Sequence, residues 1–441
     1  MPEGRRLAFV GAGAVATGPA VPGPVRRPAW DHLGLRTGVG VGVEDGRIAL
    51  LAPDEEIGEW FHAARLPDAL VDCGGRLITP GLVDPHTHAL FGGPRLEDHA
   101  RRARGDDYKA IAAAGGGILS SVADFRSRRE DDLVTLALPR LAMMAALGTT
   151  AVEIKSGYGL SVADELKALR AIARLRTHVP LEIVATFLGA HEVPADYRSR
   201  RDAYVRLVID EMLPAVARER LATFCDVFCE PGVFDLDQSE AILKAAAARG
   251  LKLKVHADEL DPFGGAELAA RLGAASADHL GAISPAGIEA LSASTTAAVL
   301  LPGTLLFLGK SRQAPARALL DAGAVVALAT DFNPGSSPSA NLPLMMTLAV
   351  SQARMQPEEA FIAATVNAAH AVRLGDGRGR LVVGGSADLV VWNCRDVREL
   401  AYWYGMPLAW RVYASGSPCL GGGWGISSAG SAGTVLSPPM S

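Results

Sequence analysis

Cysteine, charge of one sign and long apolar runs are all scarce in this sequence. Only five of the 441 residues are cysteine, an odd number spread along the chain, which argues against a disulfide-stabilised secreted domain. The net charge of −5 at pH 7 offers no basic surface for nucleic acid. No apolar run reaches the ~18 residues that a membrane-spanning helix needs. We therefore expect a cytoplasmic protein that binds a small molecule and neither nucleic acid nor a membrane.

Apolar material is plentiful. Hydrophobic residues make up 49% of the chain and charged residues 21%, which is enough to build a large buried core. A length of 441 residues is too great for one ordinary domain. It suits a barrel of roughly 250 to 300 residues with a smaller domain beside it.

The middle of the chain repeats one unit, a short apolar run followed by a longer helical stretch rich in Ala, Leu and Arg. Eight such runs occur, at residues 77–84, 149–155, 181–188, 225–230, 251–255, 274–278, 297–301 and 325–329. Eight strands that alternate with helices predict an α/β fold, a parallel (β/α)8 barrel. We assign the barrel to residues 77–375.

The two ends of the chain have a different pattern. Residues 40–52 and 380–393 read as short strands with glycine-containing turns. We predict that residues 1–76 and 376–441 pair into one small β-sandwich domain. Within it, the first ~35 residues and the tail after Cys419 are rich in Pro, Gly or Ser, which predicts irregular and mobile chain.

Histidine and acidic residues follow nearly every predicted strand, at the end of a barrel where active sites lie. His86 and His88 stand two positions apart after the first strand, so on extended chain both imidazoles share a face and can bind one ion. His256 ends the fifth strand and Asp331 follows the eighth. Any one histidine alone is more often a core residue. Together, three imidazoles and a carboxylate predict a site for one metal ion with room for water.

Two further residues are candidates for catalysis beside Asp331. His279 ends the sixth strand, where it could polarise a substrate carbonyl or serve as a structural histidine. Glu259 lies three residues beyond His256, where it could hold a leaving nitrogen or cap the following helix.

The motifs around these residues resemble those of a known group of enzymes. The stretch PGLVDPHTH at residues 80–88 resembles the first-strand signature of the amidohydrolase superfamily. Within that superfamily, five stretches are similar to the imidazolonepropionase family: FGG at 91–93 with Arg95, AAAGGGI at 112–118, EIKSGYG at 153–159, FLGAHEVP at 187–194 and DFNPGS at 331–336.

The resemblance implies a substrate-binding set. It comprises Arg95, Tyr158, His191, Glu259, Asn333, Gly335 and Ser336. The substrate of that family carries a propionate, for which an arginine offers a bidentate, charged contact. A phenol and an imidazole would add hydrogen-bond donors.

The resemblance also implies a reaction, the hydrolysis of the cyclic amide of 4-imidazolone-5-propanoate to N-formimidoyl-L-glutamate in histidine degradation. A metal-activated water would attack the ring carbonyl while His279 polarises its oxygen. Asp331 would pass the water's proton to the departing nitrogen, and Glu259 would hold the ring N–H. The ion would be zinc or iron, and the protein a homodimer.

Two alternatives stay open at this point. A related amidohydrolase that deaminates a heterocycle would use the same metal ligands, although Arg95 and Tyr158 suit an anionic side chain better than a neutral base. A barrel that serves only as a scaffold would be expected to lack metal ligands. Relatives with two ions carry a carboxylated lysine after the fourth strand, where this chain has Glu230, so we expect a single ion.

Overall fold

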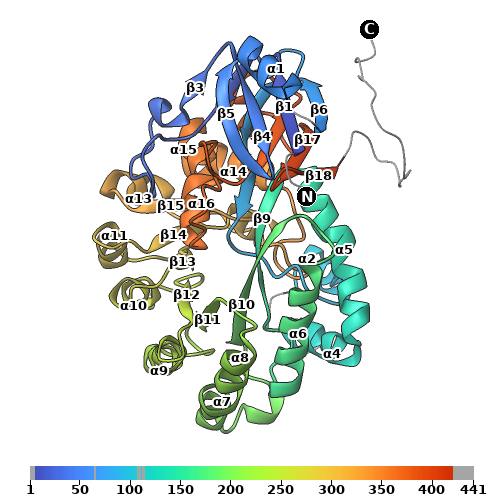
Figure 1. Ribbon diagram of the computed structural model, residues 1–441. Helices are drawn as coiled ribbons and strands as arrows, with labels where there is room; N and C mark the ends of the chain where they lie inside the picture. The colour runs from blue at the N-terminus through green and yellow to red at the C-terminus, as the bar shows by residue number, and fades with distance from the viewer. Residues whose placement is uncertain (1–4, 64–65, 107–110, 112–114, 421–441) are drawn as a thin grey trace.

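Eight parallel strands form the centre of the molecule (Figure 1). The structure is a computed structural model that describes residues 5–63, 66–106, 111 and 115–420. The strands follow one another in sequence order across the sheet: β8 (Leu82–Asp84), β9 (Thr149–Lys155), β10 (Glu182–Ala190), β11 (Phe224–Cys229), β12 (Lys252–Ala257), β13 (Ser276–His279), β14 (Ala297–Leu300) and β15 (Val325–Leu328). The predicted parallel eight-stranded architecture is confirmed.

The two edges of this sheet meet just beyond β8 and β15. Thr87 and Phe332 form a parallel bridge, and the His88 N–H donates to the Phe332 carbonyl at 3.0 Å. The Asp331 N–H donates to the His86 carbonyl at 3.1 Å. These bonds close the barrel and hold the segment of His86 and His88 against that of Asp331.

Helices surround the barrel strands (Figure 1). They are α2 (Leu96–Ala103), α4 (Ile118–Ser127), α5 (Glu130–Ala146), α6 (Val162–Leu175), α7 (Arg201–Leu207), α8 (Leu213–Glu219), α9 (Leu236–Ala247), α10 (Gly265–Arg271), α11 (Pro285–Ser292), α12 (Pro302–Phe307), α13 (Ala316–Ala322), α14 (Leu342–Ala353), α15 (Pro357–Ala363), α16 (Val366–Ala371) and α17 (Glu399–Tyr402). A π-helical turn, Val208–Met212, joins α7 to α8, and short 3-10 turns lie at Trp30–Leu33 and Ala195–Tyr197.

The local sequence explains why such helices form and which face they bury. In α6, the Ser161 side chain accepts the Asp164 N–H and so caps the first turn. Leu166, Leu169 and Ile172 recur every three residues and are all buried against the barrel.

Two further sheets form the small β domain. The first has the order β5 (Arg47–Pro53), β4 (Val39–Glu44), β1 (Arg5–Val10), β6 (Leu66–Asp72), with α1 (Asp54–His62) packed on it. The second has the order β18 (Ser417–Leu420), β17 (Ala409–Ala414), β16 (Leu389–Trp392), β7 (Leu77–Pro80), β2 (Ala14–Ala16), β3 (Leu35–Arg36). Phe9, Val41, Ile78 and Val391 belong to their shared core. Both ends of the chain contribute, as expected for a small β domain built from them.

The predicted first barrel strand at 77–84 is two strands in the structure. β7 pairs antiparallel with β16 in the small domain, and only β8 joins the barrel. Gly81 lies between them, where a Cβ atom would come within 2.0 Å of Thr150 Oγ1. The sequence shows one apolar run because both halves are buried, although in different cores.

The N-terminal segment also differs from its prediction. Residues 5–10 and 14–16 form strands rather than irregular chain. Their partners β4, β6 and β7 lie far along the sequence, so no local pattern reveals the pairing. Most of the tail predicted to be mobile falls at 421–441, outside the described residues.

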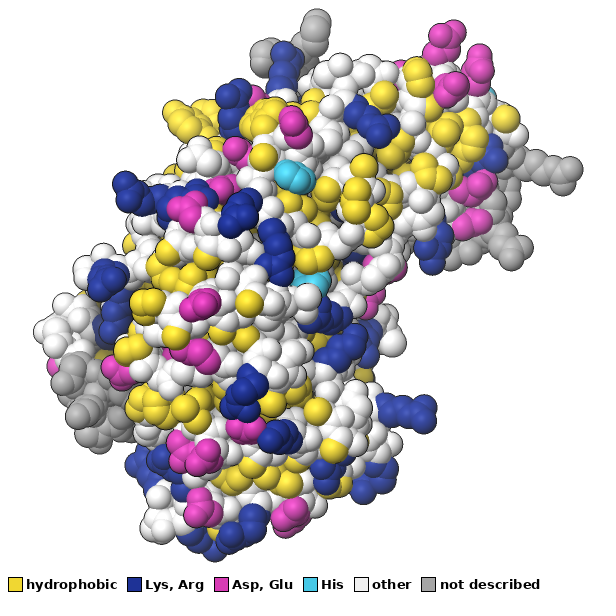
Figure 2. All heavy atoms as spheres, turned by 90° about the vertical axis from the view of Figure 1, so that its left-hand side faces the viewer, with side chains coloured by type: hydrophobic (Ala, Val, Ile, Leu, Met, Phe, Trp, Pro, Cys, Tyr) yellow, Lys and Arg dark blue, Asp and Glu magenta, His cyan; other side chains and the backbone are white. Residues whose placement is uncertain are grey.

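The outer surface carries mixed charge. On the face shown in Figure 2, basic and acidic side chains are interspersed among apolar ones. Within the described ranges, no helix combines the length and the apolar character that a bilayer crossing requires.

Candidate active site

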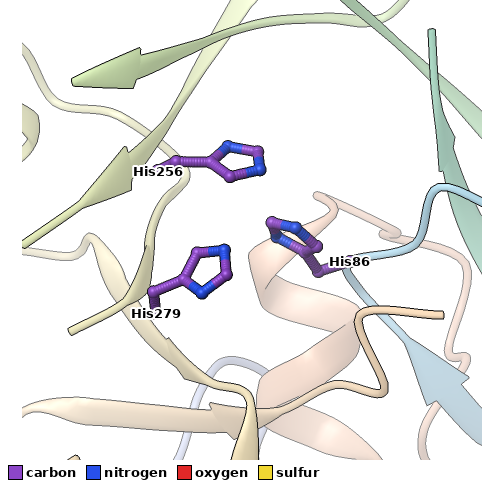
Figure 3. Close-up of side chains that lie close together, drawn as sticks. All are labelled: His86, His256 and His279. Atoms are coloured by element: carbon purple, nitrogen blue, oxygen red, sulfur yellow. The ribbon is translucent and has the colours of Figure 1, made fainter. Parts of the chain in front are cut away.

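Imidazoles from β12, from β13 and from the segment that follows β8 converge at the carboxyl end of the barrel (Figure 3). His86, His256 and His279 each offer a ring nitrogen, and these atoms lie within 4.8 Å of one another. A second such group joins His86 and His88 to Asp331, whose Oδ1 lies 3.6 Å from the Nε2 atom of each histidine. The four residues predicted as metal ligands therefore lie together, and His279 lies beside them.

Unusual backbone conformations bring some of these side chains inward. His279 and Asp331 have positive φ angles of 81° and 53°. Such angles are rare for residues other than glycine and carry a strain of about 1–3 kcal/mol. In a regular strand, Asp278 and His279 would face opposite sides, yet both lie in the site. The strained end of β13 thus brings two neighbouring side chains into the candidate site.

The histidines are suited to bind an ion. Burial lowers the pKa of His86 and His88 well below the usual value and that of His256 to about 3, which keeps all three imidazoles neutral. The Nε2 atoms of His86 and His256 are buried, and no hydrogen-bond partner for them occurs among the described residues. Neutral imidazoles with free nitrogens beside a carboxylate match the donor set of a zinc or iron site.

Two carboxylates lie behind these histidines. Asp278 Oδ2 is 2.6 Å from His86 Nδ1, and Asp226 Oδ2 is 2.9 Å from His256 Nδ1. When Nδ1 carries the proton toward a carboxylate, Nε2 is left free for a metal ion.

Two buried lysines lie beneath these carboxylates, and sequence reasoning did not assign them or their partners a role. Lys155 Nζ lies 2.9 Å from Glu153 Oε1 and 2.8 Å from Asp226 Oδ2. Lys254 Nζ lies 3.4 Å from Asp278 Oδ2 and donates to the Pro85 carbonyl at 2.6 Å.

A sequence signal for this layer does exist. Glu153 and Lys155 are two apart within β9, and Lys254 and His256 are two apart within β12. Charged residues at such spacing in an otherwise apolar strand share its inward face.

Burial raises the pKa of both candidate catalytic carboxyl groups. Asp331 Oδ2 accepts a hydrogen bond from Thr304 Oγ1 at 2.6 Å, and burial raises its pKa to about 6. Glu259 Oε2 lies 3.5 Å from His279 Nδ1, and burial raises the pKa of this carboxyl to about 7. Groups with such values can exchange protons near neutral pH.

Two of the predicted substrate-binding residues, Tyr158 and His191, border the histidine cluster. The His191 ring stacks on that of His88 at 4.9 Å between centroids, and the Tyr158 ring lies 6.1 Å from His88. Burial raises the pKa of Tyr158, while the Arg95 guanidinium opposes that rise. The Tyr158 ring also lies 5.7 Å from that of His191, so it borders two of the clustered imidazoles.

Arg95 lies against the loop that follows β15. A Cβ atom at Gly335 would lie 2.1 Å from Arg95 Nη1, so any larger residue there would displace the guanidinium from this position. Asn333 Oδ1 shapes this loop by accepting the N–H groups of Gly335 at 2.8 Å and Ser336 at 2.7 Å. Arg95 also pairs with Asp98 at 2.7 Å and borders a cavity of about 370 Å³.

The chain matches known proteins over most of its length. A family model described as "Amidohydrolase family" matches residues 94–401. An imidazolonepropionase from Bacillus velezensis is 45% identical over 394 residues, which are 89% of this chain and 92% of that protein.

Solved structures show the same fold at lower identity. A triazine hydrolase from Arthobacter aurescens superposes with a TM-score of 0.74 at 17% identity and covers 95% of each chain. An adenosine deaminase from Xanthomonas campestris with bound zinc has a TM-score of 0.65 at 19% identity, over 96% of this chain and 94% of that one.

Proposed function

The chain belongs to the amidohydrolase family and, within it, to the imidazolonepropionases, and we propose on this basis that it opens the ring of 4-imidazolone-5-propanoate. The reaction hydrolyses the cyclic amide and yields N-formimidoyl-L-glutamate in the degradation of histidine. One observation supports this substrate most directly. The buried phenol of Tyr158 lies 6.1 Å from His88 between ring centroids, and the Arg95 guanidinium lies against Gly335; the two groups are suited to bind the propionate of an anionic ring.

We propose His86, His88, His256 and Asp331 as the ligands of one metal ion, zinc or iron. When bound, such an ion supplies Lewis acidity that makes water a nucleophile near neutral pH. The neutral imidazoles and the two orphaned Nε2 atoms support this ligand set.

The chain's own residues would then direct the chemistry. Neutral His279 is suited to donate a hydrogen bond to the carbonyl oxygen as negative charge develops there. Asp331 would take the proton of the attacking water and give it to the departing ring nitrogen. Glu259 would accept a hydrogen bond from the ring N–H group and offset the positive charge of the amidine-like part of the ring. Asn333 would hold the floor of the pocket with Gly335 and Ser336.

The role of His279 has a direct test, because it also lies within 4.8 Å of His86 and His256 through its ring nitrogen. His279→Gln should lower kcat and leave the metal content of the purified protein unchanged. Equal loss of metal would make His279 a ligand instead.

The function itself is tested by the ultraviolet absorbance of freshly made imidazolonepropionate. Absorbance should fall with the purified protein, stop falling after chelator treatment, and fall again when zinc or iron is returned. A fully metal-loaded protein that leaves the substrate intact but releases ammonia from amino-heterocycles would favour the deaminase alternative. The homodimer, the cytoplasmic location and the choice between zinc and iron stay predictions.

A further inference from the structure

The first turn of α6 carries a buried carboxylate that faces the loop after β9. Glu165 is 0% exposed, and its Oε1 atom accepts the N–H groups of Gly159 and Leu160, both at 2.8 Å. The Gly157 N–H lies 3.2 Å from each of its two carboxylate oxygens. In the part of the chain that the structure describes, no lysine or arginine forms an ion pair with it. The Ser156 side chain and three backbone N–H groups of the loop that follows it are thus its hydrogen-bond partners.

That loop, residues 157–160, carries one of the proposed substrate contacts and packs against a second. Tyr158 lies within it, and the Gly157 carbonyl lies 3.0 Å from His191 Nδ1. A Cβ atom at Gly157 would come within 2.9 Å of the same ring nitrogen, so the loop packs directly on His191. A shift of the loop would therefore move both a phenol and an imidazole.

The conformation of this loop depends on contacts with α6, which lies outside the loop. Gly157 and Leu160 have positive φ angles of 107° and 50°, and the second is unfavourable for a residue with a side chain. A Cβ atom at Gly159 would lie 2.5 Å from the Glu165 nitrogen, so the loop rests on α6 without a gap. Three N–H groups turned toward one carboxylate make charge-assisted hydrogen bonds, which are about twice as strong as neutral ones.

We propose that Glu165 is a positioning residue for substrate binding. Its carboxylate holds the loop at 157–160 in the conformation that presents Tyr158 and His191 to the propionate end of the substrate. The identity of that substrate rests on the proposed function, whereas the role in holding the loop does not.

The kinetic test uses Glu165→Gln, which keeps the size of the side chain but leaves only one accepting terminal atom. The KM for imidazolonepropionate should rise roughly 10- to 100-fold, in line with the loss of charged hydrogen bonds, while kcat changes less than about 3-fold and metal content is unchanged. Adding Tyr158→Phe to this variant should cause little further loss, because both changes remove the same contact. An unchanged KM, or effects of the two substitutions that multiply, would show the proposal to be wrong.

Two companion variants separate positioning from general stability. Glu359→Gln removes another buried carboxylate, which accepts the Gln356 N–H at 2.8 Å and pairs with Arg317 far from the loop. It should lower Tm and leave KM unchanged. Gly159→Ala pushes the loop off α6 while Glu165 is intact, and should raise KM in the same selective way. A KM for Gly159→Ala equal to that of the unmodified enzyme would contradict the proposal even if Glu165→Gln failed to fold.

Hydrogen exchange gives a readout that needs no substrate. The amides of residues 157, 159 and 160 should be protected in the unmodified protein and should exchange at least about 10-fold faster in Glu165→Gln, while those of β9 keep their protection. If the unmodified enzyme fails to open imidazolonepropionate, the proposed function is wrong and this measurement still decides the role of Glu165. Protection of the loop that is unchanged in Glu165→Gln overturns the inference.

Discussion

The Nδ1 atom of His86 lies 2.6 Å from Oδ2 of Asp278, and both side chains are fully buried. This contact fixes the imidazole ring so that Nε2 faces the proposed metal. Asp278→Asn should therefore weaken metal binding by about 10- to 100-fold, the usual effect of removing such a carboxylate. Competition with a chromophoric chelator measures the dissociation constant directly.

A control for this prediction lies in the small domain. Asp388 is equally buried and pairs with Arg378 at 2.9 Å. Asp388→Asn should lower Tm and leave the metal dissociation constant unchanged. Weakened metal binding in the control but not in Asp278→Asn would contradict a specific role for the carboxylate behind His86.

The buried ammonium of Lys155 should matter for stability. Lys155→Met would leave Glu153 and Asp226 without their closest cation in a site that excludes water. Breaking a buried ion pair from one side costs about 3–5 kcal/mol, so the free energy of unfolding in urea should fall by that amount.

A compensating variant tests the cause of that loss. Lys155→Met combined with Glu153→Gln removes one charge of each sign, and it should regain part of the lost stability. If the double variant is less stable than Lys155→Met alone, uncompensated charge is not the cause.

The contact between Arg95 and Gly335 predicts a defect in substrate binding. Gly335→Ala places a methyl group where the Arg95 guanidinium lies, so KM should rise, and Arg95→Met should raise it in the same way. Losing a charged hydrogen bond to the propionate corresponds to roughly 10- to 100-fold. Steady-state kinetics would check this, and an imidazolone that lacks the carboxylate should show no difference between these variants and the unmodified enzyme.

The carboxyl group of Glu230 predicts a pH dependence of stability. Burial raises its pKa to about 7, above the ~4.3 of an unfolded chain. Between these values the folded protein keeps a proton that the unfolded chain has lost, so this group's contribution to stability falls as pH rises through that window. Glutamine does not titrate, and Glu230→Gln should therefore gain stability relative to the unmodified protein from pH 5 to pH 8.

Urea unfolding at the two pH values measures this difference. The expected gain is at most about 1.4 kcal/mol for each pH unit. Glu55→Gln, on the exposed side of α1, controls for the general effect of removing one carboxylate. The same pH trend in both variants would rule out a special contribution from Glu230.

The strand pattern and the candidate ligands were readable in the sequence for a local reason. A buried parallel strand is a short apolar run, and the residue at its end enters the site, so His86, His256 and Asp331 could be picked out by position alone. The same local rule failed at 77–84, because β7 and β8 form one apolar run but belong to two different cores. Gly81 lies at the boundary between these two strands, and the reason for a glycine there is the nearness of Thr150, which only the structure shows.

The amino-acid sequence by itself determined the barrel, the family resemblance and the types of residue that meet at the carboxyl ends of the strands. The tertiary structure alone decided which charged groups touch. Lys155 meets Asp226 and Asp278 meets His86 across 71 and 192 positions of chain. No periodic pattern in the sequence predicts such pairs, because only closure of the barrel brings them together. The strength of each pair depends on the exclusion of water by strands that lie far apart in the chain.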